Sequence, residues 1–594
     1  MLKLFVGLIL LSAPFLLLIF SKNKRADFVV ILFFETLLQS ALGIFTQAFG
    51  IFYYQVILWA NLLAFLFFIF FVLKQIPRIN VNFKRIDWAL VLVFIISLAT
   101  LFQVHFNYTG RYNMVNDELF QYHNANNMSY VYPYFSDEWY AVALAKESIN
   151  SHSLPLKNPF DNSFFFNVEM FFHSFIAEIM LFLGLSPLNS YTTLSIFINT
   201  LIIVLAYIFL RESNLSKTTS AVFALCLLYI TSASNLPGIW NLIPFTMGIF
   251  FSLIGMIFML KDKLKMALLS LLLVALFYPP LVIFYGLAVA FYLFIKFKLK
   301  DKLVFFVKPL MIIISVMLVL FVLVMISPLS GFLNYIFSKI FYKSFTGSFT
   351  PQFNPFYIVP WLAIFLLPFG LFYIFKNKKW VFYQFMLGII LWIFYAFSNF
   401  RIVIGYERTV IYVSFLAVLI SAFSVGRIKD YIQKKFSYDA SKIIKFTEIA
   451  VIILFLITTP FYTQNDRWQK LILTNYKIQA DSIPKSPANN YLTNDDLTIF
   501  QNIKSAKFLS APWKGTVVAI STGNYPVITK GGTITMGYEN PIFYQQFLDS
   551  DCQVKVNIAK EKNIDYVYST PFTCQGFNKL NESKEGFTLY EFNI

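Results

Sequence analysis

The chain has 594 residues, of which 58% are hydrophobic and only 13% are charged. Soluble globular proteins carry about a quarter charged residues, so this composition excludes an ordinary soluble protein and indicates extensive contact with lipid. The formal net charge of +17 would suggest nucleic-acid binding in a soluble chain. Here the basic residues lie in short loops between apolar runs, as membrane topology requires, and we expect no nucleic-acid partner.

Apolar runs of roughly the length that crosses a bilayer, about 20 residues, occupy most of residues 1–463. They lie near 2–20, 28–50, 52–74, 88–105, 165–184, 191–210, 218–233, 239–260, 266–278, 280–296, 303–326, 356–375, 380–398, 408–425 and 443–462. Run 165–184 contains Glu169, His173 and Glu178, and charged groups are costly at the bilayer centre. We expect this run to lie at the interface, and the rest to form a mostly α-helical polytopic bundle of about fourteen spans.

Basic loops predict how this bundle is oriented in the plasma membrane. They occur at 21–25, 74–87, 211–217, 261–265, 296–302, 376–379 and 427–445. The positive-inside rule places these loops in the cytoplasm. The first long loop, 106–164, and everything after Pro460 then lie outside. Runs 266–278 and 280–296 meet at Pro279–Pro280 and are expected to form a tight hairpin.

The tail, residues 464–594, is polar and is expected to be an extracytoplasmic α/β domain. Strand-like patches lie at Thr516–Ser521, Pro526–Thr529, Ile564–Tyr568 and Phe587–Phe592, and helical patterns at Asp495–Lys507 and Val554–Lys562. Cys552 and Cys574 both lie in this domain. Outside the cell they could form a disulfide, although spacing alone does not establish the pairing.

The first long outer loop contains the most informative residues. Ser136 is a suitable N-cap for a helix that begins with Asp137 and Glu138. Acidic residues in a first helical turn are often ordinary capping groups, because the helix dipole favours negative charge there. The functional interpretation is a carboxylate at the lipid–water boundary that acts as a general base or binds a divalent metal.

Two arginines, Arg401 and Arg408, lie at the outer end of the run 408–425, against the positive-inside bias. A single outer arginine is commonly an anchor whose stem lies along apolar surface. The alternative is phosphate recognition, because the guanidinium binds two phosphate oxygens at once and keeps its charge.

The loop resembles the GT-C superfamily of integral-membrane glycosyltransferases. Asp137–Glu138, Tyr140, Pro155 and Asn158–Pro159 fit the order of that superfamily's acidic motif, aromatic residue, helix and proline segment. The layout of many spans, one long first outer loop and a C-terminal outer domain also fits. The chain departs from the pattern by three extra preceding spans and by an insert of about 30 residues containing Asp117–Glu118 and His123.

The resemblance implies a sugar donor linked to polyprenyl phosphate in the membrane lipid, and a glycan, lipid or protein acceptor. It implies that Asp137 takes a proton from the acceptor, with Glu138 orienting it or sharing the site. Arg408, and second Arg401, would bind the donor phosphate. The possible substrate contacts are Trp139, Tyr140, Asn158, Tyr406 and Glu407. No cofactor is certain, and a divalent metal is possible.

Two other functions remain open. A transporter or lipid flippase without covalent chemistry would place ionisable residues in mid-span and often show repeated halves. Here the ionisable residues gather at the outer surface and no repeat is evident, which favours the enzyme. A non-catalytic scaffold of the same fold is the third possibility, and Asp117–Glu118 is the alternative acidic pair.

Overall fold

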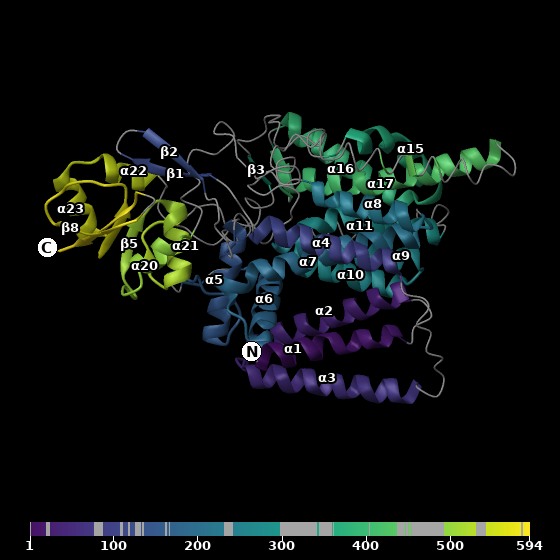
Figure 1. Ribbon diagram of the computed structural model, residues 1–594, viewed down its shortest axis with the longest axis horizontal. Coiled ribbons are helices and arrows are strands. Elements are labelled where there is room, and N and C mark those ends of the chain that lie inside the picture. Colours follow the sequence, from purple (N-terminus) through teal and green to yellow (C-terminus); the bar gives the residue numbers. More distant parts are fainter. Residues whose placement is uncertain are drawn as a thin grey trace, which may run out of the picture.

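The computed structural model is mostly helical, with a small sheet near the C-terminus (Figure 1). The residues that the structure describes are 2–19, 24–75, 87–106, 111–116, 119–124, 132–133, 136–160, 163–164, 167–230, 241–297, 341–343, 359, 361–398, 400–402, 404–435, 492–529, 542–583 and 586–593, with a few single positions between 446 and 453.

The N-terminal helices are α1 (Leu2–Ser12), α2 (Lys24–Ala48), α3 (Tyr54–Gln75) and α4 (Trp88–Phe106). The first expected span does not run as one α-helix, because Pro14 lies where the chain changes to a 3₁₀ segment, η1 (Ala13–Ile19). Helices α1, α2 and α3 lie side by side at one flank of the molecule, in purple (Figure 1).

Four helices follow: α5 (Ser136–Ser151), α6 (Met170–Leu183), α7 (Pro187–Glu212) and α8 (Lys217–Cys226). At 14 residues, α6 is about 21 Å long, less than the hydrocarbon thickness of about 30 Å. Helix α10 (Leu264–Phe277) is equally short, so length does not distinguish α6 from the expected spans, and the interfacial position of run 165–184 stays a prediction. Helix α7 has 26 residues and is long enough to reach from one membrane surface to the other.

The rest of the bundle comprises α9 (Pro244–Leu260), α10 (Leu264–Phe277), α11 (Val282–Lys296), α15 (Trp361–Asn377), α16 (Lys379–Ser398) and α17 (Tyr406–Lys435). The expected break at Pro279–Pro280 is confirmed, because a 3₁₀ turn, η5 (Pro279–Leu281), separates α10 from α11. Helix α17 is almost entirely enclosed by its neighbours, and α15 packs closely along it.

Four of the described helical segments are long and apolar enough to cross a membrane: Lys24–Ala48, Pro187–Glu212, Pro279–Lys296 and Arg408–Ile428. Further apolar helices of 10–17 residues accompany them, and this is an integral membrane protein. Within the described residues these four helices are fewer than the fourteen or so spans expected, partly because several helices are shorter than their apolar runs. Run 303–326 and most of run 443–462 lie outside the described residues.

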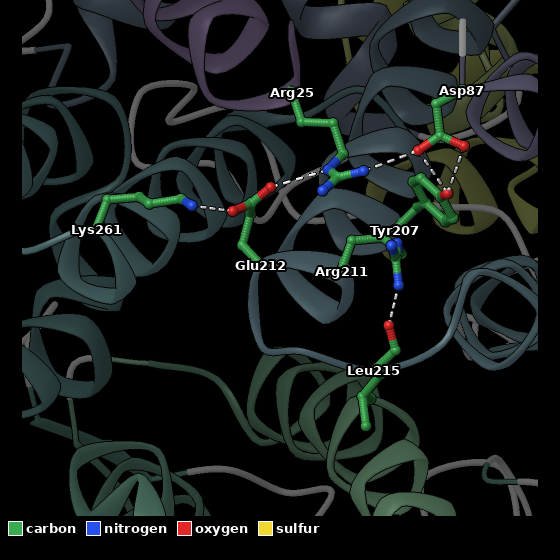
Figure 2. A network of polar contacts seen from close by, with 7 residues as sticks. All are labelled: Arg25, Asp87, Tyr207, Arg211, Glu212, Leu215 and Lys261. Carbon is green, nitrogen blue, oxygen red and sulfur yellow. Dashed lines mark hydrogen bonds and ion pairs between the residues drawn. The ribbon is translucent and has the colours of Figure 1, made fainter. Parts of the chain in front are cut away.

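One end of α7 carries a cluster of ion pairs, which we call the Glu212 cluster (Figure 2). The Arg25 guanidinium donates to Glu212 at 2.9 Å and to Asp87 at 3.0 Å. Lys261 also pairs with Glu212, and the Tyr207 hydroxyl donates to Asp87 at 3.0 Å. The four charged residues lie in four of the basic loops that were predicted to share one side of the membrane. The structure brings them together at one end of the bundle.

The C-terminal domain contains a five-stranded sheet in the order β6-β5-β7-β9-β8. Its strands are β5 (Lys507–Ser510), β6 (Tyr525–Pro526), β7 (Tyr566–Ser569), β8 (Phe577–Glu582) and β9 (Thr588–Phe592), and its helices are α20 (Asn494–Ile499), α21 (Pro512–Thr522), α22 (Ile542–Asp549) and α23 (Cys552–Glu561). Strand β5 is parallel to β6 and β7, whereas β9 is antiparallel to β7 and β8. The α/β prediction for this domain is confirmed.

Two details of that prediction were wrong. Thr516–Ser521, expected to be a strand, lies inside helix α21, which begins with Pro512 and is capped by Gly523 at φ +79°. The helical pattern expected over Asp495–Lys507 ends at Ile499, and Lys507 begins strand β5. The pairing of Cys552 with Cys574, which the spacing left open, is confirmed by a disulfide between them.

Helix α5 joins the C-terminal domain to the membrane helices, and the domain lies at the end of the molecule beyond it (Figure 1). The Lys146 ammonium of α5 donates to the carbonyl of Ile520, near the C-terminus of α21, at 3.2 Å. Val517 and Val518 of α21 belong to the same continuous apolar core as Trp139 of α5. Helix α5 is therefore packed between the two parts of the protein.

Candidate functional site

The site is built where the first turns of α5 and α17 meet. The carboxylate of Asp137 accepts a hydrogen bond from the Arg408 guanidinium at 2.8 Å, although the two residues are 271 positions apart. Both side chains are reachable, with 34% of Asp137 and 19% of Arg408 exposed. The structure thus brings together the two residues that the sequence singled out separately.

Arg408 also packs against an aromatic ring. Its guanidinium carbon lies 5.7 Å from the ring centroid of Phe245, in the first turn of α9. A cation over an aromatic face is attracted by the negative charge density of that face. The ring and the Asp137 carboxylate together fix the orientation of the planar group, which matters for a side chain that binds anions through a rigid fork.

Glu138, expected to orient Asp137 or to share the site, points into the protein. It is 2% exposed, and its carboxylate accepts from the Leu242 amide at 2.9 Å and from the Ser195 hydroxyl at 3.5 Å. The Tyr191 hydroxyl donates to the carbonyl of the same Leu242. Since Leu242 lies two residues before α9 begins at Pro244, Glu138 holds the segment that places Phe245 against Arg408. It is a positioning residue in this arrangement.

Three expected substrate contacts are buried in the structure. Trp139 is fully enclosed, with its ring 6.4 Å from that of Tyr132. Tyr140 lies edge-on to Phe160, and Asn158 accepts from the Phe160 amide at 3.0 Å. These side chains pack α5 and hold the loop that follows it, so any contribution they make to substrate binding is through the shape of the site.

The other expected contacts lie on elements whose side chains are outside the described residues. Arg401 belongs to β4 (Phe400–Ile402), which pairs with β3 (Phe341–Lys343) in an antiparallel register that sets Tyr342 opposite Arg401. The side chains of Tyr406 and Glu407 at the start of α17 are not described. Asp117–Glu118, the alternative acidic pair, also lies outside, between β1 (Arg111–Asn116) and β2 (Leu119–Asn124).

A third charged residue, Glu169, was not recognised as part of the site. It is half-buried directly before α6, close enough to Asp137 and Arg408 to interact with both electrostatically. Burial raises the pKa of the Glu169 carboxyl to about 8, the negative charge of Asp137 adds to this, and Arg408 opposes it. The signal in the sequence was an acidic residue at the start of an apolar run, which we interpreted only as an argument against a span.

The described residues of this site do not include a complete set of ligands for a divalent metal. In the part of the chain that the structure describes, no group of three or more His, Cys, Asp or Glu side chains could hold a metal ion. The carboxylate of Asp137, the expected ligand, is engaged by the guanidinium of Arg408.

No protein-family model and no curated protein matches the chain. Among solved structures, it is similar to the Archaeoglobus fulgidus oligosaccharyltransferase AglB in complex with an inhibitory peptide and a dolichol-phosphate, with 12% identity, a TM-score of 0.48, and coverage of 82% of this chain and 69% of that one. The apo form of the A. fulgidus oligosaccharyltransferase has 13% identity and a TM-score of 0.48, with coverage of 83% of this chain and 70% of that one. Its complex with Zn and sulfate has 11% identity and a TM-score of 0.44, with coverage of 84% of this chain and 73% of that one.

These structural neighbours are GT-C superfamily membrane glycosyltransferases, which is the superfamily that the sequence resembles. With identities of 11–13% and TM-scores below 0.5, the similarity does not identify an activity.

Proposed function

We propose that the protein is a glycosyltransferase that moves a sugar from a polyprenyl-phosphate-linked donor to an acceptor on the extracytoplasmic side of the plasma membrane. The observation that carries this proposal is the direct contact of Asp137 with Arg408 at 2.8 Å. Glycosyl transfer from a lipid phosphate needs a base beside the acceptor and a cation beside the leaving group, and these two side chains supply both groups.

In the proposed reaction, Asp137 accepts the proton of the acceptor hydroxyl as its oxygen forms a bond to the anomeric carbon of the sugar. The bond between that carbon and the phosphate oxygen breaks, and the electron pair leaves with the polyprenyl phosphate. Arg408 stabilises the negative charge that develops on the phosphate. A guanidinium suits this task because it remains protonated and donates two parallel hydrogen bonds.

The ion pair between Asp137 and Arg408 has a role before transfer. An arriving phosphate competes for the Arg408 fork, and as it takes over these hydrogen bonds the Asp137 carboxylate loses its cation. A carboxylate relieved of an adjacent cation is a stronger base. Donor binding therefore prepares the acid–base group, while Glu169, neutral below a pH of about 8, adds no negative charge to repel the phosphate.

The position of the pair within the bundle supports a lipid-borne donor. Tyr191 and Ser195, near the start of α7, adjoin the Glu138 contacts, whereas Glu212 ends α7 in the cluster at the opposite end. The site therefore lies at one surface of the apolar bundle, where a lipid phosphate and a polar acceptor can meet. The proposal includes the polytopic topology of about fourteen spans and a C-terminal domain outside that helps select the acceptor.

The test is transfer by the purified full-length protein, offered a panel of polyprenyl-phosphate sugars with glycan, lipid and peptide acceptors. We expect labelled product and released polyprenyl phosphate with at least one donor, and loss of both in Asp137→Asn. The control is Asp262→Asn, because Asp262 is an exposed carboxylate on the connection between α9 and α10 that pairs with Lys296. Movement of intact donor across vesicles without bond cleavage would reject the enzyme in favour of a flippase.

The orientation has its own test, motivated by the basic loops. Cysteines introduced at Ser151 and Ser521 should react with an impermeant thiol reagent in intact cells, whereas one at Ser437 should not. Labelling at Ser437 alone would reverse the topology and remove the basis for an extracytoplasmic reaction.

A further inference from the structure

A polar stripe runs along α2, one of the helices that precede the site. Glu35, Gln39, Gly43 and Gln47 follow one another at intervals of four residues, so they share one face of the helix. The remainder of α2 is apolar enough for a span of 25 residues. Ionisable and amide side chains inside a membrane helix are costly and usually mark a functional site, and the proposed glycosyl transfer uses none of these residues.

Helix α6 packs against this stripe at Gly43. A Cβ atom at Gly43 would lie 2.8 Å from the carbonyl oxygen of Ser174 and 3.1 Å from the Cβ of Glu178. The Gln47 amide donates to the same Ser174 carbonyl at 3.2 Å. A missing side chain lets two membrane helices approach closely, and here it allows the polar stripe of α2 to face Glu178.

Four buried oxygens of α2 and α6 accept no hydrogen bond within the described residues. They are both carboxylate oxygens of Glu178, which is 0% exposed, and the amide oxygens of Gln39 and Gln47, each 1% exposed. The amide nitrogen of Gln39 is already used, donating to Glu35 at 2.7 Å and to Asn61 of α3 at 2.8 Å. Buried acceptors without donors are costly, and oxygen acceptors alone are the ligand set that hard cations prefer.

The charged group near Glu178 also favours a bound cation. The group that acts on it electrostatically is Glu35, another carboxylate. Among the described residues, two basic side chains on helices packed near α6 have other partners: Lys3 of α1 lies over the Tyr54 ring, and Lys146 of α5 donates to the Ile520 carbonyl. Two carboxylates in a low-dielectric environment cannot both remain charged without a compensating positive charge.

We propose that the polar stripe of α2 and Glu178 of α6 form an intramembrane site for a small monovalent cation, either Na⁺ or a proton. Glu178 and Glu35 supply the negative charge, and the amide oxygens of Gln39 and Gln47 supply further acceptors. Helices α2 and α3 thereby gain a role of their own, separate from the Asp137–Arg408 site. The occupant sits between α2 and α6 and links the N-terminal helices to the element that begins beside Glu169.

The experiment measures binding of radioactive sodium to the purified full-length protein at neutral and acidic pH, with choline at equal ionic strength as the reference. Wild-type protein should bind sodium at neutral pH and release it on acidification. Glu178→Gln keeps the size of the side chain but removes its charge. Because the negative charge that faces the cation is removed, sodium affinity should fall at least tenfold.

Asp262→Asn is the matched control, because it removes a carboxylate that lies on the surface of the same bundle, and it should bind sodium as the wild type does. If the occupant is a proton, no sodium binds, and infrared spectroscopy shows a protonated carboxyl that is lost in Glu178→Gln. The proposal is overturned if the wild type shows neither sodium binding nor a carboxyl protonation that depends on Glu178. None of these readouts depends on glycosyl transfer, so the cation-site proposal can fail while the proposed function holds, and the reverse.

Discussion

The two ends of α7 carry charged residues in different arrangements. At the Glu212 cluster, Glu212 pairs with both Arg25 and Lys261, and Arg25 pairs in turn with Asp87. The Glu212 side chain is 5% exposed, whereas Asp137 at the opposite site is 34% exposed. A cluster that cross-links several helices around one buried carboxylate holds those helices together, whereas a single ion pair with a half-exposed carboxylate can exchange its partner for a ligand.

The comparison separates what each end should do when it is altered. Changes at the Glu212 cluster should reduce stability and leave substrate binding as it is. Changes at Asp137 and Arg408 should reduce turnover or donor binding and leave the fold intact. The four predictions below test this separation in order of decreasing expected effect.

The largest effect is expected for Asp137→Asn. Removing a general base costs about 10²–10⁴-fold in rate, so turnover should almost disappear while the variant still inserts and unfolds at nearly the wild-type temperature. Initial rates of sugar transfer and a thermal unfolding curve measure both. Asp117→Asn, in the hairpin insert, should have a much smaller effect; if it abolished transfer and Asp137→Asn did not, the acid would have been assigned to the wrong pair.

Next, Arg408→Ala should weaken donor binding as well as turnover. Hydrogen bonds to charged groups contribute about 1.5–3 kcal/mol, which corresponds to a rise of roughly 10- to 100-fold in the KM for the donor. Titration of the rate with donor at saturating acceptor gives this value. Arg25→Ala removes an arginine at the other end of α7, and an equal rise in KM there would show that the effect is not local.

The same Arg25→Ala variant should mainly lose stability. It leaves Asp87 without this ion pair and Glu212 with Lys261 as its remaining ion-pair partner, at a cost of about 1–3 kcal/mol. The measurement is the free energy of unfolding of the purified protein in detergent, compared with that of Lys217→Ala on the same side. An unchanged unfolding curve would mean that the Glu212 cluster does not hold these helices together.

The smallest effect concerns pH. Above a pH of about 8, Glu169 loses its proton, and its negative charge then opposes the donor phosphate and competes for Arg408. The KM for the donor should rise a few-fold across this range in the wild type and stay flat in Glu169→Gln. Parallel pH profiles of the two proteins make the measurement, and identical profiles would exclude Glu169 from the site.

The same titration affects stability with a defined sign. The pKa of Glu169 is about 8 in the folded protein and 4.5 ordinarily, so between these values the folded state binds more protons than the unfolded state. The free energy of unfolding therefore decreases as pH rises through this range. In Glu169→Gln this contribution to the decrease should be absent.

Part of the helical architecture could be predicted because the apolar runs are long. The break at Pro279 and the helices on either side of it followed from composition alone. The contact of Asp137 with Arg408 was expected from chemistry, because one reaction would need both groups at one place. Their 2.8 Å separation required the fold, since no local pattern relates residues 271 positions apart.

The sequence could not reveal features whose signals were hidden by burial. Helix α21 is enclosed from Lys514 through Ile520, so its residues show no helical alternation of polar and apolar faces, and the β-branched residues suggested a strand. Glu169 gained its place in the site only through the fold, which sets it beside Asp137. The polar stripe on α2 was visible as i, i+4 spacing, but its partner Glu178 lies on another helix.

The packing of α5 has a consequence for how the protein can be divided. Its residues from Trp139 to Ala145 are all buried, some against the bundle and some against α21, with Lys146 fastened to the Ile520 carbonyl. A chain shortened before residue 492 would leave one side of this helix uncovered and let its first turn, with Asp137, shift relative to Arg408. The C-terminal domain thus helps to hold Asp137 in position. Membrane helices expressed without this domain should bind donor yet transfer poorly.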